Sequence, residues 1–290
     1  MNSIVENAYA KLNISLDVTG KRPDGFHDML MVMQSVTLCD EVTVELREGK
    51  MSSAETNLCF IPNDERNLAV KAANAFFAAA GIENAGAHIK INKRIPVCSG
   101  MGGGSSDAAA VLRALNKLTG KGLSADELCT VAAQVGSDVA FCVRGGTCLA
   151  SGRGDKLVQL SPMPDCGIVI CKPEFSISTP ELFRRIDAVK LRCHPDTAGI
   201  CRAIERGELE SIARRMYNVF EDVSDRRMSS IAKVKSDILD AGALGAVMTG
   251  TGSAVFGIFQ DSDSAVKAAD VLKNEYATCF YARPCAVLDS

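Results

Sequence analysis

The chain has 290 residues, a formal net charge of −3 at pH 7 and a pI near 5.7. Hydrophobic residues make up 47% of the chain and charged residues 23%, which is the composition of an ordinary globular protein with room for a sizeable core. The slightly acidic balance argues against a nucleic-acid-binding protein, whose domain is expected to be basic.

The cysteines and the N-terminal residues bear on the cellular compartment. The 12 cysteines are scattered and form no Cys-x-x-Cys pair, so neither a zinc ribbon nor a redox pair is indicated. Most of them lie in apolar runs, where a reduced cysteine behaves as a small buried hydrophobe. The N-terminus has no basic segment followed by an apolar one, and no window of about 18 residues is apolar and uncharged. We therefore expect a soluble cytoplasmic protein that binds neither nucleic acid nor a membrane and is a monomer or a weak homodimer.

Apolar periodicity predicts both strands and helices along the chain. Alternation predicts strands, and apolar positions three or four residues apart predict helices. Ser124 and Glu127 have the spacing of a capping box that opens a helix. In chain order, we expect strands over 9–18, 29–38, 41–46, 58–60, 87–93, 147–150, 156–160, 167–171, 246–248, 255–259 and 279–287. We expect helices over 67–80, 108–118, 124–136, 138–143, 179–187 and 262–275, and three more between 196 and 241.

The order of these elements indicates the fold class. Strands and helices segregate along the chain instead of alternating strictly, which favours an α+β protein with two lobes. The glycine-containing stretch 151–155 and the proline-containing stretch 161–164 form the predicted junction. We place the N-terminal domain at residues 1–153 and the C-terminal domain at residues 154–290.

The rest of the sequence is organised around the stretch 96–107, which reads Pro-Val-Cys-Ser-Gly-Met-Gly-Gly-Gly-Ser-Ser-Asp. It follows a predicted strand and leads into a predicted helix, which we expect Ser105, Ser106 or Asp107 to cap. A glycine loop before a helix N-terminus exposes a row of backbone N–H groups and binds phosphate. No lysine follows the glycines as in a Walker A loop, and Ser105 stands where a G-x-G-x-x-G turn needs glycine. A flexible glycine turn with an ordinary cap is the alternative.

This stretch resembles the nucleotide loop of the GHMP kinases, which include galactokinase, homoserine kinase, mevalonate kinase and phosphomevalonate kinase. The triple glycine followed by Ser-Ser-Asp-Ala resembles the branch that acts on a cytidine-diphosphate-linked methylerythritol in the non-mevalonate isoprenoid pathway. The resemblance implies an N-terminal nucleotide-binding α/β lobe, a C-terminal ferredoxin-like α+β lobe and a cleft between them. It also implies that the γ-phosphate of ATP is transferred to the hydroxyl at the 2-position of that substrate.

The resemblance assigns the cofactor and its contacts. Mg²⁺ is expected to be carried with the ATP, and the sequence offers no dedicated metal cage for it. The residues expected to hold the triphosphate are Pro96, Val97, Cys98, Ser99, Gly100, Met101, Gly102, Gly103, Gly104, Ser105 and Ser106.

Lys11 and Asp138 are the predicted catalytic residues. Lys11 and Asn13 share a face of the first strand because side chains alternate, although both would also suit a solvated edge. The resemblance implies that Lys11 contacts the substrate hydroxyl and Asp138, and that Asn13 holds the substrate. Asp138 stands at a predicted helix N-terminus, where an aspartate is often only a cap. As a general base it would accept the proton of the substrate hydroxyl.

Further segments are assigned to the substrate by the resemblance. Phe26 and His27 offer a ring face and a ring N–H to a planar base, although a histidine in a polar loop is usually just solvated. The turn with Gly250 and Gly252 alone indicates a tight hairpin, but it resembles the third motif of these kinases, which packs against the phosphate loop and closes the cleft. Smaller matches place Asn67 and Lys93 on the nucleotide side, and Thr179, Pro180 and Phe183 on the cytidine side. Asn67 alone would suit a helix cap, and Phe183 alone a core residue.

The sequence departs from the family pattern in the loop, and alternative functions stay open. The loop reads Cys-Ser-Gly-Met where the family more often has Gly-Ala-Gly-Leu. Ser99 and Met101 are small or flexible replacements that should preserve the shape of the loop, and Cys98 beside bound phosphate predicts sensitivity to thiol reagents. The alternatives are a GHMP kinase for homoserine, mevalonate or a sugar, and a nucleotide-binding regulator without catalysis.

Overall fold

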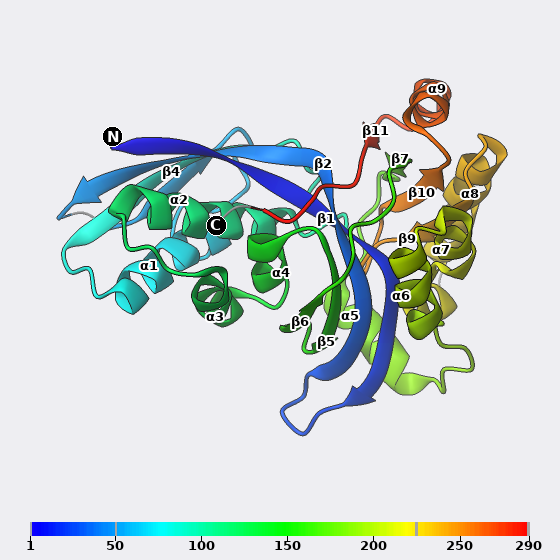
Figure 1. The fold of residues 1–290 in the computed structure, drawn as a ribbon, viewed down its shortest axis with the longest axis horizontal. Helices are drawn as coiled ribbons and strands as arrows, with labels where there is room; N and C mark the ends of the chain where they lie inside the picture. Colours follow the sequence, from blue (N-terminus) through cyan, green and yellow to red (C-terminus); the bar gives the residue numbers. More distant parts are fainter. Residues whose placement is uncertain (1, 50, 224–225, 289–290) are drawn as a thin grey trace.

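The computed structural model describes residues 2–49, 51–223 and 226–288. Its longest elements, β1 (Ser3–Lys21) and β2 (His27–Glu48), pair antiparallel and run through the whole molecule (Figure 1). They form a seven-stranded sheet in which β3 (Ser53–Thr56), β4 (Ala85–Asn92), β2, β1 and β8 (Tyr217–Asn218) lie in this order. The hairpin of β5 (Thr147–Gly152) and β6 (Lys156–Gln159) pairs with the half of β2 that β4 leaves free.

Helices cover one face of this sheet in the N-terminal part of the chain (Figure 1). Asn67 caps the first of them through the N–H of Ala69, and Gly81 ends it with a φ of 62°, which residues with a Cβ rarely adopt. The predicted capping box between Ser124 and Glu127 is present. The helices are α1 (Leu68–Ala80), α2 (Gly103–Thr119), α3 (Ala125–Val135) and α4 (Val139–Arg144).

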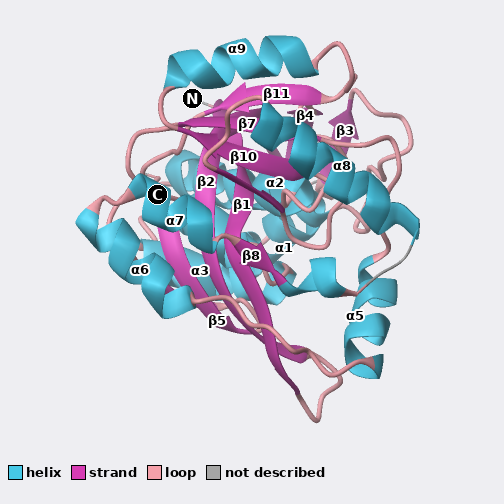
Figure 2. Ribbon diagram, turned by 90° about the vertical axis from the view of Figure 1, so that its right-hand side faces the viewer, coloured by secondary structure: helices cyan, strands magenta, loops and turns pink. Residues whose placement is uncertain are grey.

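The C-terminal part builds a second, four-stranded antiparallel sheet. Its strands lie in the order β11 (Cys279–Ala282), β7 (Gly167–Cys171), β10 (Val255–Phe259) and β9 (Gly245–Met248). Helices α8 (Arg226–Asp240) and α9 (Ser262–Leu272) pack on this sheet (Figure 2). Helices α5 (Thr179–Ala188), α6 (Thr197–Arg206), α7 (Leu209–Arg215) and η1 (Val219–Asp222) lie between β7 and α8 in sequence. The connectivity is that of a ferredoxin-like βαββαβ unit, so the predicted α+β fold is confirmed.

A bulge in β1 decides which of its side chains face the cleft. Leu12 packs in a core cluster between the two sheets, whereas Leu16 packs in the cluster that includes α1–α4. The register against β2 shifts between Asn13 and Ser15, and such a bulge moves the following side chains to the other face of the strand. Lys11, Leu12 and Asn13 precede the bulge, where side chains alternate regularly. Lys11 and Asn13 therefore lie on the face opposite Leu12, as predicted.

Several expectations about strands were wrong. The strands expected over 29–38 and 41–46 are the single strand β2, and the short strand expected near 58–60 is β3, at 53–56. The last strand ends at Ala282 instead of 287. The two-residue strand β8 and the short helix η1 were not predicted, because such short elements are stabilised by tertiary contacts and leave no periodic pattern.

The start of α2 also differs from the expectation. The helix begins inside the glycine run, with Gly102 at the N-cap position and no side-chain cap, instead of behind Ser105, Ser106 or Asp107. The side chains expected to cap it bond elsewhere. Ser106 Oγ donates to the carbonyl oxygen of Tyr9 at 2.6 Å, and the Asp107 carboxylate pairs with Lys93.

The boundary between the lobes stays a prediction. The β5–β6 hairpin spans the predicted boundary at 153/154, and both of its strands belong to the large sheet. Near the C-terminus, Pro284 and Val287 bridge back to Val36 and Gly145, so the chain returns to the N-terminal lobe. None of the helices in the described part of the chain has the length and apolarity needed to cross a bilayer.

Candidate active site

A cleft with two chambers, each of about 640 Å³, lies beside the glycine loop. We call the chamber lined by Asn67 and Lys93 the loop chamber, and the chamber lined by Phe26, His27 and Phe183 the aromatic chamber. The wall common to both comes from the glycine loop, the start of α5 and the second glycine turn. It consists of Gly100, Gly102, Ser105, Thr179, Pro180 and Thr251.

Backbone contacts hold the glycine loop from two sides. The N–H of Lys11 donates to the carbonyl oxygen of Met101 at 3.0 Å. Gly100 has a φ of +79°, and a Cβ there would lie 2.1 Å from the carbonyl oxygen of Thr249. A Cβ on Gly250 would lie 2.7 Å from the carbonyl oxygen of Gly100. The expected packing of the second glycine turn on the loop is present, and it leaves no room for a side chain at either glycine.

Lys11 and Asp138 line the aromatic chamber, and a Cβ on Gly102, in the wall common to both chambers, would lie 3.0 Å from Lys11 Cγ. Lys11 is 4% exposed, and its Nζ donates to Asn13 Oδ1 at 2.7 Å and lies 3.5 Å from Asp138 Oδ2. The burial of Lys11 and Asn13 rules out a solvated edge. Asp138 occupies the N-cap position of α4 but makes no capping hydrogen bond, so its carboxylate remains available to the cleft.

Arg113 ties together the elements that carry this pair. The residue lies on α2 and is 1% exposed. Its Nη1 donates to the carbonyl oxygen of Cys142 in α4, and its Nη2 donates to that of Asn7 in β1, each at 2.9 Å. A guanidinium presents its donors in one rigid plane, so it holds both elements to α2 at once. Asp138 immediately precedes α4, and Lys11 lies on β1.

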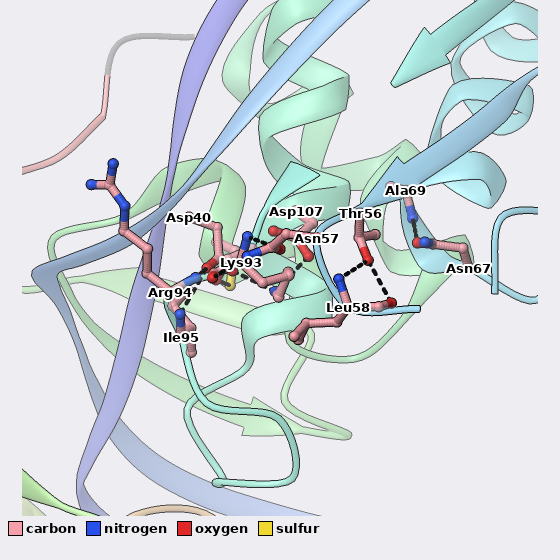
Figure 3. Close-up of polar contacts among 12 residues, drawn as sticks. Asp40, Thr56, Asn57, Leu58, Asn67, Ala69, Lys93, Arg94, Ile95 and Asp107 are labelled. Atoms are coloured by element: carbon pink, nitrogen blue, oxygen red, sulfur yellow. Dashed lines mark hydrogen bonds and ion pairs between the residues drawn. The ribbon is translucent and has the colours of Figure 1, made fainter. Parts of the chain in front are cut away.

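The loop chamber contains Asn67, which Figure 3 shows at the start of α1. Its Oδ1 accepts from Ala69 N–H at 3.0 Å, and its Nδ2 donates to the carbonyl oxygen of Pro62 at 2.9 Å. Asn67 is therefore both a helix cap and a wall of the chamber, and its side-chain hydrogen bonds are already committed. Cys98, in the left-handed region at φ +53°, is exposed on the opposite wall.

Lys93 is more enclosed than its expected role suggested. Its ammonium group contacts a carboxylate oxygen of Asp40 and lies 2.7 Å from Asp107 Oδ2 (Figure 3). Burial lowers the pKa of Lys93, but the two carboxylates more than offset this and leave its pKa above the ordinary value. The pKa of Asp107 is raised to about 7. Burial is the main cause, the Lys93 ammonium group lowers this pKa, and the Asp40 carboxylate raises it.

The aromatic chamber gathers rings and charged groups from both lobes. The ring of His27 stacks on that of Phe183, with centroids 4.6 Å apart and an interplanar angle of 24°. His27 Nε2 lies 2.7 Å from Asp187 Oδ1, and this hydrogen bond, with one from a neighbouring lysine, holds the pKa of Asp187 below its usual range. The guanidinium of Arg153 lies 3.9 Å from the centre of the Phe26 ring. Phe183 is thus a wall of the site and not only a core residue.

Some placements differ from the sequence-based assignment, and some site residues were missed. Gly252, assigned to the substrate side, lines the loop chamber and not the aromatic chamber. Arg153 was missed because it lies in the turn interpreted as a domain junction. Asn218, whose Nδ2 donates to the carbonyl oxygens of Met248 and Gly250 at 2.7 and 2.8 Å, holds the second glycine turn and carries no local signal in the sequence.

The side chains that line the cleft show whether the protein itself could hold a metal ion. Within residues 2–49, 51–223 and 226–288, no group of three His, Cys, Asp or Glu side chains is arranged to hold a metal ion. Asp138 is the only carboxylate among the residues that line the aromatic chamber, and Asp107 the only one among those that line the loop chamber. The site therefore fits an ion that arrives already bound to phosphate oxygens, and not one held in a protein cage.

Fold and site together define a small-molecule kinase. Residues 67–146 match the family description "GHMP kinases N terminal domain", and residues 201–278 match "GHMP kinases C terminal". The chain belongs to the GHMP kinase family, and it is an ATP-dependent enzyme of that family. A homoserine kinase structure from Cytophaga hutchinsonii, at 20% identity and a TM-score of 0.78 over 99% of this chain and 96% of its own, shares the fold.

Within this family, two relatives that are about 40% identical to the chain carry the same name. The chain is 41% identical over 276 residues to a Clostridium botulinum protein named 4-diphosphocytidyl-2-C-methyl-D-erythritol kinase, covering 95% of this chain and 98% of the relative. A protein of the same name from Acetivibrio thermocellus is 40% identical over 280 residues, covering 97% and 98%. A crystal structure titled 4-(cytidine 5'-diphospho)-2C-methyl-D-erythritol kinase matches with a TM-score of 0.79 at 29% identity, over 97% of this chain and 99% of that one.

Proposed function

We propose that this protein transfers the γ-phosphate of ATP to the hydroxyl at the 2-position of 4-diphosphocytidyl-2-C-methyl-D-erythritol. The observation that carries the proposal is that Lys11 and Asp138 line the aromatic chamber, with Lys11 packed against Gly102 in the wall that this chamber shares with the equally large loop chamber. The names of the similar proteins support the choice of acceptor.

ATP occupies the loop chamber in this proposal. The main-chain N–H groups of residues 96–106, at the N-terminus of α2, hold the triphosphate, because unpaired donors and the helix dipole favour an anion there. Asn67 and Lys93 lie toward the nucleoside, and both already have partners within the protein. Mg²⁺ would enter with the nucleotide and supply positive charge that offsets the negative charge of the phosphates.

Asp138 and Lys11 act on the acceptor hydroxyl. Asp138 orients this hydroxyl and accepts its proton, and the ammonium group of Lys11, 3.5 Å from the carboxylate, stabilises charge on the moving phosphoryl group. An ionised, charge-paired aspartate is a weak base. Phosphoryl transfer tolerates a weak base, because its loose transition state needs little deprotonation before the bond to the leaving group breaks.

The aromatic chamber holds the cytidine diphosphate part of the acceptor. The rings of Phe26, His27 and Phe183 offer faces for the base, and phenylalanine at position 26 supplies a face without a hydroxyl. Arg153 supplies a cation for the diphosphate, since no carboxylate of the described residues forms an ion pair with it. Asn13, Thr179, Pro180 and Gly250 form the wall near the reacting hydroxyl.

The proposal also covers the compartment, the oligomeric state and the choice of acceptor. It acts in the cytoplasm as a monomer or weak homodimer, with a small molecule as its partner. The aromatic chamber favours the cytidine-linked acceptor over homoserine, mevalonate or a sugar, because these carry no planar base to stack on its rings. The presence of both Lys11 and Asp138 favours catalysis over a purely regulatory role.

The test is formation of ADP from ATP with a panel of acceptors. The cytidine-linked methylerythritol should be phosphorylated, and homoserine, mevalonate and galactose should not. Asp138→Ala should lower kcat by at least about 100-fold while ATP still binds. Phe183→Leu, which keeps apolar volume but removes the ring, should raise KM for the acceptor and leave KM for ATP unchanged. Turnover of another panel member, or ATP binding without turnover of any acceptor, would reassign the function.

A further inference from the structure

One carboxylate oxygen beside the glycine loop has no partner. Asp107 Oδ2 lies 2.7 Å from Lys93 Nζ, but Oδ1 is buried and makes no hydrogen bond to any residue that the structure describes. The residue is 4% exposed and lines the loop chamber, one helical turn beyond Gly103 on α2. A buried oxygen without a partner is rare and costly, so it indicates a group that arrives from the chamber.

The charges around Asp107 leave one negative charge uncompensated. Asp40, at 0% exposure on β2, uses one oxygen for the Lys93 ammonium and the other for the N–H groups of Arg94 and Ile95, at 2.5 and 2.7 Å. Both of its oxygens therefore have hydrogen-bond donors. Helix α1, which packs against α2, buries only apolar side chains. Lys93 is thus the one cation shared by two buried carboxylates in this cluster.

A triphosphate in the loop chamber would add negative charge next to this uncompensated carboxylate. Its negative charges gather at the N-terminus of α2, about one turn from Asp107, and like charges at this distance inside a protein repel strongly. The cluster relieves the repulsion when Asp107 takes up a proton. The protonated Oδ1 then becomes a donor to a phosphate oxygen, since Asp40, the other side-chain partner of the protonated acid, already accepts from Lys93 and from two backbone N–H groups.

We propose that Asp107 binds ATP as a neutral carboxylic acid, donating from Oδ1 to a phosphate oxygen, so that ATP binding takes up one proton from solvent. The inference rests on the proposed function only in placing ATP in the loop chamber. Burial already raises the pKa of Asp107 to about 7 in the free protein, and bound phosphate raises it further. The uptake should therefore be partial near pH 7 and larger near pH 8, where more of the free protein starts with Asp107 ionised.

The test is isothermal titration calorimetry with ATP at saturating Mg²⁺, in buffers of different ionisation enthalpy, from pH 6 to 8.5. The wild-type protein should show this larger proton uptake at pH 8 than at pH 7, and its ATP affinity should fall as the pH rises above 7. Asp107→Asn, which is neutral and keeps a donor, should bind ATP within about threefold of wild type at pH 7 with no uptake assigned to this site. Asp107→Ala, which lacks the donor, should bind about tenfold more weakly than Asp107→Asn.

The outcomes test proton uptake by Asp107 separately from the proposed kinase function. Wild-type binding with no proton uptake overturns it even if the asparagine variant does not fold, and so does equal uptake by Asp107→Asn. Proton release, or a loss of Mg²⁺ affinity in Asp107→Asn, would instead place a cation at Oδ1. A complete absence of ATP binding would reject the proposed function itself. Asp263→Asn, at an exposed carboxylate of α9, should behave as wild type and serves as the matched control.

Discussion

The Nζ atom of Lys11 lies 3.5 Å from Oδ2 of Asp138 in the aromatic chamber, where Lys11 packs against Gly102 of the wall that both chambers share. The lysine is almost fully buried, whereas the aspartate side chain is 31% exposed and makes no capping hydrogen bond. The ammonium group is thus fixed and the carboxylate is accessible from the cleft. This is the arrangement that positions a hydroxyl for transfer and stabilises the charge of the moving phosphoryl group.

Lys11→Met should lower kcat by about 100- to 1,000-fold, because it removes the cation next to the reacting groups. In the double variant that also carries Asp138→Asn, the fold-loss in kcat should be much smaller than the product of the two single fold-losses, since the residues act as a unit. Steady-state kinetics of the four proteins measure this. Lys267→Met, at an exposed position on α9, is the control, and independent effects of the two catalytic substitutions would contradict the pairing.

Gly100→Ala should destabilise the fold and abolish the loop geometry. Its Cβ would lie 2.1 Å from a backbone oxygen, and the φ of +79° adds strain, for a loss of about 2–5 kcal/mol in the free energy of unfolding. Gly120→Ala has a similar φ of +63° with no atom within 4 Å, so it should cost only about 1 kcal/mol. Urea denaturation of both variants compares the two losses, and equal losses would mean that the loop relaxes around the added methyl group.

Arg153→Gln should raise KM for the cytidine-linked acceptor about tenfold, with KM for ATP unchanged. The guanidinium stacks on Phe26 and supplies the positive charge for the diphosphate, and glutamine keeps much of the length without the charge. The effect on KM should shrink as the salt concentration rises, because it is electrostatic. Initial rates at two salt concentrations provide the measurement, and an equal rise in KM for ATP would move Arg153 out of the acceptor site.

Iodoacetamide should inactivate the protein through Cys98, and ATP should protect it. Cys98 is exposed on the wall of the loop chamber, whereas burial raises the pKa of the Cys142 thiol to about 12 and keeps it unreactive. Peptide mass spectrometry locates the label. The Cys98→Ser variant should keep its activity after treatment, and inactivation of this variant at the wild-type rate would point to Cys59 or Cys193, which are also exposed.

The contribution of Asp107 to the stability of the protein without nucleotide should fall as the pH rises from about 4 to 7. Burial raises the pKa of Asp107 to about 7 in the folded state, above its ordinary value of 3.8, so in this range the folded state binds more protons than the unfolded state. The Tm of Asp107→Asn should therefore decline less than that of wild type between pH 5 and pH 8. Differential scanning calorimetry compares the two slopes, and parallel slopes would show that Asp107 does not titrate in this window.

Local patterns predicted much of the fold, because the interactions behind them span only a few residues. The cap at Asn67, the capping box at Ser124 and the alternation that places Lys11 and Asn13 on one face all follow from neighbours in the chain. The start of α2 escaped this reasoning. The side chain of Ser106 prefers a carbonyl oxygen of β1, a partner that no local pattern reveals.

The sequence by itself determined the α+β class, the presence of a glycine loop before a helix at residues 96–106 and the residue types available for catalysis, since these depend on periodicity and on the backbone freedom of glycine. Only the tertiary structure decided that Asp138 reaches Lys11, that Thr249 closes on Gly100 and that Asp107 shares Lys93 with Asp40. These contacts join residues far apart in the chain. Their geometry depends on how the two sheets and their helices pack, which short-range patterns do not encode.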